Sequence, residues 1–185
     1  AAVAWEDAAG GGNLVLINTA AADNSAICLT ITGLDSTYDS YLLIGADLIN
    51  ATDNTDTYMR FGDSGGIDGG ACDYGYYGHG NRTNGTSDVI FQDGGASFIK
   101  LNSGGIGSAA GEGYGFNLTL HRPGDGVMRP AVSGTFAYHA TDTVLSGGQL
   151  IGGRNAVITL DRVQIFASCG NIESGRFSVF GIKHS

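Results

Sequence analysis

Short segments along most of the chain alternate apolar and polar residues, which is the pattern of β-strands with one buried face. The alternation is clearest in residues 27–31 and 116–120. Polar or glycine-rich turns separate these segments. Only Ala1–Ala9 has the composition of a short helix, which would end at the glycines of residues 10–12. We predict ten strands, at Leu14–Ile17, Ala26–Thr32, Tyr41–Leu48, Thr57–Phe61, Asp88–Phe91, Ser97–Leu101, Gly115–His121, Val132–Tyr138, Val157–Phe166 and Arg176–Lys183.

The last stretch of the chain has the strongest strand pattern. Two alternating segments are joined by a turn of small residues, so we expect a hairpin at the C-terminus. Phe177 and Val179 should share one face of its second strand, and Phe180 and Ile182 the other. At least one of these pairs should be buried in the core.

Many short strands joined by long glycine-rich loops indicate an all-β protein. The chain has 185 residues, of which 32 are glycine and 42% are hydrophobic. We predict a two-sheet β-sandwich of jelly-roll type that forms a single domain over residues 13–185, preceded by an N-terminal arm at residues 1–12. Residues 62–84 are expected to form a long loop, which either carries function or caps one end of the sandwich.

The charge of the chain excludes two classes of partner. The net charge is −9, with only 9 Lys and Arg residues, so neither nucleic acid nor an anionic membrane surface is an expected partner. No apolar run reaches the length of a membrane helix. Cys28 is expected in the core, and Cys72 and Cys169 in loops as free thiols, which fits synthesis in a reducing cytoplasm.

We expect no enzymatic activity and no cofactor. Residues 62–66 read Gly-Asp-Ser-Gly-Gly, as around the nucleophile of chymotrypsin-like proteases, but no histidine precedes His79 to activate Ser64. Asp63, Asp68 and Asp73 could offer oxygens to Ca²⁺, although their spacing is not that of an EF-hand, and solvated loop carboxylates are the preferred interpretation. A pair of carboxylates for sugar hydrolysis, formed in space, stays open.

Aromatic residues are the candidates for an interface. Tyr74, Tyr76, Tyr77 and His79 cluster in the expected long loop, and Trp5 is the one large aromatic of the N-terminal arm. The tyrosines have three possible roles, which are contact with another subunit, stacking on sugar rings, and packing of the loop onto the sandwich. Trp5 has two, contact with a neighbouring subunit and covering the end of its own sandwich.

Two segments of the chain resemble a known family. One is Tyr38–Leu48, followed by Ala51–Asn54 and Thr57–Phe61, and the other is Ser168–Ile182. Together they resemble small β-rich virion proteins of tailed bacteriophages, which occur as head-decoration (cement) proteins and as fibre domains.

The resemblance implies a function and partners. It implies a capsid decoration protein, located in the virion, that binds the major capsid protein and associates with itself as a homotrimer. The alternative is a tail-fibre or receptor-binding module that recognises a host surface glycan. The chain has no heptad repeat for a fibre shaft, so the capsid location is preferred.

Overall fold

The computed structural model describes residues 14–85, 89–121 and 126–183. These ranges contain strands and turns and no α-helix. The predicted helix at residues 1–9, the arm at residues 1–12 and Trp5 lie outside the described residues. The strands are β1 (Leu14–Ala21), β2 (Cys28–Thr32), β3 (Ser40–Asn50), β4 (Thr57–Asp63), β5 (Gly66–Ile67), β6 (Tyr74–Arg82), β7 (Val89–Ala96), β8 (Ile99–Lys100), β9 (Gly113–His121), β10 (Ala131–His139), β11 (Leu145–Arg154), β12 (Arg162–Ala167) and β13 (Ile172–Ile182).

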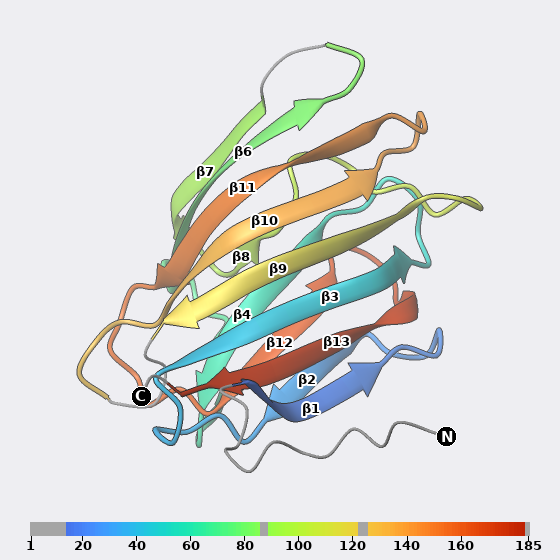
Figure 1. The fold of residues 1–185 in the computed structure, drawn as a ribbon. Helices are drawn as coiled ribbons and strands as arrows, with labels where there is room; N and C mark the ends of the chain where they lie inside the picture. The colour runs from blue at the N-terminus through green and yellow to red at the C-terminus, as the bar shows by residue number, and fades with distance from the viewer. Residues whose placement is uncertain (1–13, 86–88, 122–125, 184–185) are drawn as a thin grey trace, which may run out of the picture.

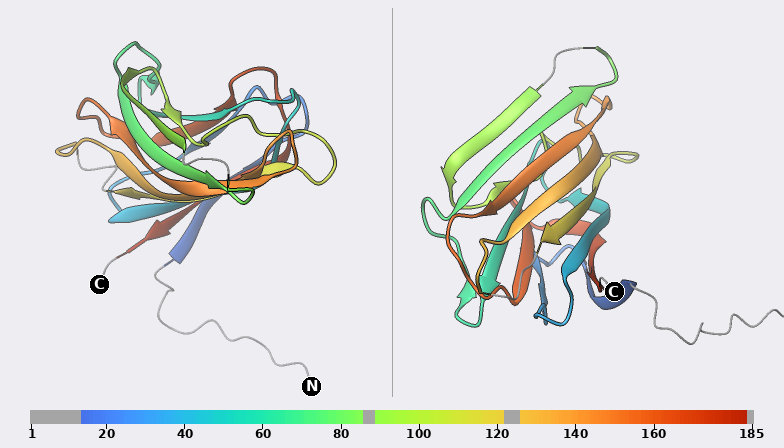
Figure 2. Two further views of the ribbon diagram at one scale, coloured as in Figure 1. Left: turned by 90° about the horizontal axis from the view of Figure 1, so that it is seen from above. Right: turned by 60° about the vertical axis from the view of Figure 1, so that its left-hand side comes forward.

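The strands form two antiparallel sheets that pack face to face (Figures 1 and 2). The larger sheet has eight strands in the order β1-β13-β3-β9-β10-β11-β6-β7. The smaller sheet has the order β2-β12-β4-β5, and β8 also pairs with β4. The all-β, two-sheet sandwich predicted from the sequence is therefore confirmed.

The pairing of strands across the chain is nested, as in a jelly roll. β1 pairs with β13, β2 with β12, β3 with β9 and β4 with β8, all antiparallel. Successive pairs lie alternately in the larger and the smaller sheet. A long hairpin of four strand pairs, wrapped over itself so that the pairs alternate between two layers, has the topology of a jelly roll.

Four further strands extend the larger sheet beyond β9. β10 and β11 follow β9 in the sheet, and β6 and β7 complete its far edge (Figure 1). The prediction of a long loop at residues 62–84 was therefore wrong over its second half, because residues 74–82 are strand β6. β5, β6 and β11 are the strands that the sequence pattern did not predict, and the strand predicted at residues 157–166 begins only at Arg162.

The predicted C-terminal hairpin was half right. Both strands exist, but β12 lies in the smaller sheet and β13 in the larger, so the turn between them crosses from one layer to the other. Ser168 holds this crossing in place, because its backbone N–H donates to the Asp56 carbonyl at 2.8 Å and its hydroxyl accepts from the Asp56 N–H at 3.0 Å. The burial of Phe177 and Val179 is confirmed, since both are fully buried.

The core fills the space between the two sheets, and alternation places its side chains. Leu29 and Ile31 of β2 point into it, whereas Cys28 of the same strand is exposed. The prediction of a buried Cys28 was wrong, because alternation turns this residue to the solvent side of the smaller sheet, beside Gln164 of β12. Cys72 and Cys169 are exposed free thiols, as predicted.

Candidate binding surface

The face of the larger sheet that points away from the smaller sheet, termed here the outer face, is broad and uncharged. Two rows of side chains cross it from strand to strand, and neither contains Lys, Arg, Asp or Glu. The register defines one row as Ser178, Ile44, Asn117, Thr135, Gln149, His79 and Ile90, and the next as Phe180, Leu42, Thr119, Ser133, Ile151, Tyr77 and Gln92.

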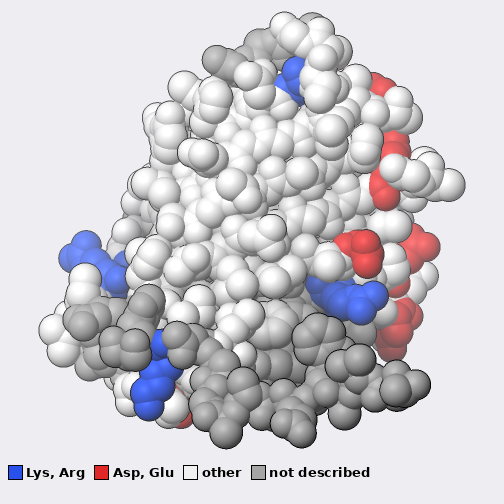
Figure 3. Space-filling view, viewed as in Figure 1, with Lys and Arg blue, Asp and Glu red and all other residues white. Residues whose placement is uncertain are grey.

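The strand period explains why these residues share one face. On β10, Val132, Phe136 and Tyr138 are buried in the core, so the residues between them, such as Thr135 and Ala137, point outward. The same alternation holds on the neighbouring strands. Charged side chains lie around the margin of the face, and its centre carries none (Figure 3). In a protein of net charge −9, the charge is thus kept away from one large surface.

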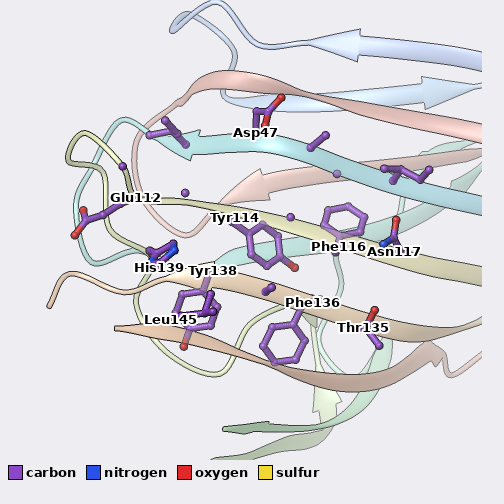
Figure 4. Close-up of a pocket in the computed structure, with 18 residues that line it drawn as sticks. Asp47, Glu112, Tyr114, Phe116, Asn117, Thr135, Phe136, Tyr138, His139 and Leu145 are labelled. Carbon is purple, nitrogen blue, oxygen red and sulfur yellow. The ribbon is translucent and has the colours of Figure 1, made fainter. Parts of the chain in front are cut away.

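A hollow lies on the outer face where β3, β9 and β10 meet (Figure 4). Small residues such as Gly115 and Ala137 line it, and a bulge in β3 between Gly45 and Leu48 widens it. Asp47, within the bulge, has a φ of 55°, the left-handed region that few residues other than glycine, asparagine and aspartate adopt. The hollow is therefore built by the backbone of the sheet.

Charged and imidazole groups around this hollow have partners within the chain. Asp47 lies 3.7 Å from the Arg176 guanidinium. Glu112 accepts a hydrogen bond from the Ala109 N–H at 2.7 Å, and the His139 ring donates from Nδ1 to the Thr143 carbonyl at 3.1 Å. Among the described residues, no group of three or more His, Cys, Asp or Glu could hold a metal ion. The hollow therefore offers a concave surface for contact with a partner, and Glu112 and His139 stabilise the loops at its margin.

A second depression, of about 470 Å³, lies at the other end of β10 and β11. Ala131, Gly153 and Gly75 are register partners and form its floor. Exposed Tyr77 and Ile151 rise beside this floor, with 43% and 56% of their surface accessible. The outer face therefore combines exposed apolar side chains with shallow relief, which suits contact with a flat partner.

The predicted interface residues separate in the structure. Tyr77 and His79 point to the outer face, and Tyr76 points inward to pack against the core. Tyr74 is fully buried. Its hydroxyl accepts from the Phe61 N–H at 2.8 Å and donates to the Asp68 carbonyl at 2.9 Å, and burial raises its pKa to about 12. The expectation that Tyr74 contacts a partner was wrong, because its side chain is buried. Its hydroxyl links Phe61 of β4 to Asp68 in the segment before β6.

The acidic residues considered for Ca²⁺ have structural roles. Asp68 and Asp73 each form an ion pair with Arg154 at 2.9 Å. Asp63 is the last residue of β4, before the tight turn to β5, and its carboxylate accepts from the Gly65 N–H at 2.7 Å. Ser64 is exposed in the same turn.

Sequence reasoning missed two of the eight strands that carry the outer face, β6 and β11, and one aromatic cluster. β11 was not predicted as a strand, so Gln149 and Ile151 were not considered as surface partners of β10. On the outer side of the smaller sheet, Tyr58 stacks on Phe98 with ring centroids 3.9 Å apart, and Phe166 packs edge-on against Tyr58. These three residues are far apart in the sequence, so only their strand pairing brings them together.

No protein-family model, curated protein sequence or solved structure matches the chain. In the part of the chain that the structure describes, no helix is long and apolar enough to cross a membrane.

Proposed function

We propose that the protein is a bacteriophage virion protein that decorates the capsid, where its outer face binds the lattice of the major capsid protein. The observation that carries this proposal is the uncharged outer face of the larger sheet. Charged residues are depleted at the centres of protein interfaces, where they would lose their hydration without full compensation. A partner that covers this face would bury exposed Tyr77, Ile151 and Ile90 and would leave the marginal charges in water.

The resemblance of residues 38–48, 51–54, 57–61 and 168–182 to virion proteins of tailed phages supports the capsid as the partner. In the fold, both segments belong to the nested strand pairs, and they include β3, β4 and β13. The added strands β6, β7, β10 and β11 are four of the eight strands of the larger sheet and carry exposed Tyr77, Ile90 and Ile151. In this proposal, the jelly roll is the scaffold that the chain shares with those virion proteins, and the added strands bind the capsid lattice.

Capsids that lack the protein provide the test. Wild-type protein is added to them and bound protein is measured by sedimentation. Ile151→Lys, which places a charge at the centre of the outer face, should weaken binding at least tenfold. Val157→Lys is the matched control, because Val157 has a similar exposure of 48% but lies outside the outer face, between β11 and β12. Equal binding by all three proteins would contradict the proposal.

The second candidate function is a receptor- or glycan-binding module of the tail. The exposed ring of Tyr77, beside the depression floored by Ala131 and Gly153, favours it, because sugar rings stack on exposed aromatic faces. Labelling of the protein in purified virions, followed by electron microscopy, distinguishes the two locations. Signal on the tail, together with glycan-array binding that Tyr77→Ala abolishes, would replace the capsid proposal.

A further inference from the structure

The edge strand β1 is unusually apolar for a strand at the end of a sheet. Six of its eight residues are exposed, including Leu14, Val15 and Leu16 at 51%, 41% and 54%. Because these three are consecutive, apolar side chains project from both faces of the strand. β1 and β2 lie side by side at this end of the sandwich (Figure 1).

β1 also has an open hydrogen-bonding edge. Of the described strands, only β13 pairs with β1, so its opposite edge has no strand partner within the described part of the chain. Proteins commonly protect such edges with lysine, other charges or proline. β1 reads Leu-Val-Leu-Ile-Asn-Thr-Ala-Ala and contains none of these. Its one irregularity is a register shift between Leu16 and Asn18.

The other edge of the same sheet is different. β7 carries the charged residue Asp93, whose carboxylate accepts from the Gly95 N–H of the same strand at 2.8 Å. A register shift also interrupts its pairing with β6. β1 also has a register shift but carries no charge, so the two ends of the sheet are not equivalent.

We propose that β1 pairs antiparallel with β1 of a second copy of the chain, which joins two larger sheets into one continuous sheet. The distribution of large and small side chains along β1 indicates that the partner of this edge is a second copy of β1. The first half of β1 is large and aliphatic, and the second half is small or polar. A two-fold axis between Ile17 and Asn18 places each large residue opposite a small or polar one, in the pairs Leu14 with Ala21, Val15 with Ala20, Leu16 with Thr19 and Ile17 with Asn18.

The absence of charge removes the main obstacle to this pairing. A strand that meets its own copy meets its own charges, and like charges opposite one another are destabilising. β1 has none, so its backbone N–H and C=O groups can pair and its exposed aliphatic side chains can be buried. This inference goes beyond the proposed function, because it concerns the edge of the larger sheet and not its outer face. Purified protein without capsids tests it, so its failure is separable from failure of capsid binding.

Analytical ultracentrifugation of the full chain measures the outcome directly. Wild-type protein should sediment at twice the chain mass of 18.9 kDa. Leu16→Lys should shift it to the monomer mass. Ile90→Lys is the matched control, because Ile90 is 58% exposed on the opposite edge strand of the same sheet, and it should remain dimeric. Circular dichroism verifies that each variant is folded, and Leu14→Lys replaces Leu16→Lys if the latter is not.

Hydrogen exchange supplies a second measurement. The amides of β1 should exchange more slowly as protein concentration rises, while those of β7 should not change. A monomeric wild type would overturn the proposal, and so would the trimer that the family resemblance implies, because a two-fold pairing gives even-numbered assemblies. Retention of the dimer by both Leu14→Lys and Leu16→Lys would overturn it too. If the chain's own residues 1–13 cover β1, Leu16→Lys should lower the melting temperature of a monomeric protein, which also contradicts the proposal.

Discussion

Tyr76 and Tyr77 are neighbours in the sequence, but their side chains lie on opposite faces of β6. Tyr76 points between the layers, where its ring centroid lies 6.3 Å from that of Phe91. Tyr77 points to the outer face beside its register partner Ile151. A strand turns successive side chains to opposite sides, so the two tyrosines cannot form one stacking platform. One contributes to stability and the other to the surface.

This separation predicts opposite effects of two alanine substitutions. Tyr76→Ala removes a half-buried ring from the core and should lower the free energy of unfolding by about 2 kcal/mol. Tyr77→Ala removes an exposed ring and should change it by less than about 0.5 kcal/mol. Urea unfolding measures both. Equal destabilisation by the two variants would show that the faces of β6 are assigned wrongly.

The burial of Phe177 predicts a large loss of stability on truncation. Its ring is fully buried and lies 6.0 Å, centroid to centroid, from that of Phe116. Phe177→Ala should lower the free energy of unfolding by about 3–5 kcal/mol, because the cavity cannot collapse between two sheets. Phe180→Ala serves as the control, since Phe180 is half-buried on the outer face and should lose less. Unchanged melting temperatures for both variants would contradict the placement of β13.

Much of the fold was predictable because alternation acts locally. Each of the ten predicted segments overlaps a strand, and the shared face of Phe177 and Val179 follows from period two alone. The crossing between β12 and β13 was not predictable in this way. A turn of small residues serves equally well for a hairpin and for a passage between layers, and the choice depends on which distant strand each segment pairs with.

The unpredicted strands β6 and β11 have a different cause. Glycine weakens strand patterns, and β6 reads Tyr-Gly-Tyr-Tyr-Gly-His-Gly-Asn-Arg. The glycines on its inner face leave no room for a side chain, because side chains from neighbouring elements occupy the space where a Cβ would lie. Gly78 faces Phe91, and Gly80 faces Ser103. Because this reason lies on other strands, the outer face that β6 and β11 carry could not be predicted from the pattern of either segment alone.

The contact between Gly78 and Phe91 gives a prediction with an internal control. A Cβ on Gly78 would lie 2.0 Å from Cζ of Phe91, so Gly78→Ala should destabilise the protein by about 1–3 kcal/mol through overpacking. Shortening the opposing ring, as Gly78→Ala with Phe91→Leu, should recover part of this loss relative to the sum of the single variants.

Gly94 on the neighbouring strand supplies the comparison. A Cβ there meets no atom within 4 Å, so Gly94→Ala should have little effect on stability. Thermal unfolding of the four variants measures the set. If Gly78→Ala and Gly94→Ala are equally tolerated, the inner face of β6 is not packed against Phe91.

The buried tyrosines predict a loss of stability at alkaline pH. Burial raises the pKa of Tyr41 and of Tyr74 to about 12, and the pKa of Tyr114 well above its ordinary value of 10.0. A group whose pKa is higher in the folded than in the unfolded state holds its proton more tightly when folded. The stability it contributes is therefore complete below about pH 10 and is lost as pH rises through 12.

Tyr74→Phe separates this ionisation from the other titrations. At pH 7 the variant should be less stable by about 1–3 kcal/mol, because the buried Phe61 N–H loses its acceptor. Between pH 10 and 12 it should lose less stability than wild type, by up to about 2 kcal/mol, because it has no hydroxyl to ionise. Guanidinium unfolding at each pH gives both differences. The same slope for both proteins over this range would show that Tyr74 does not titrate as a buried group.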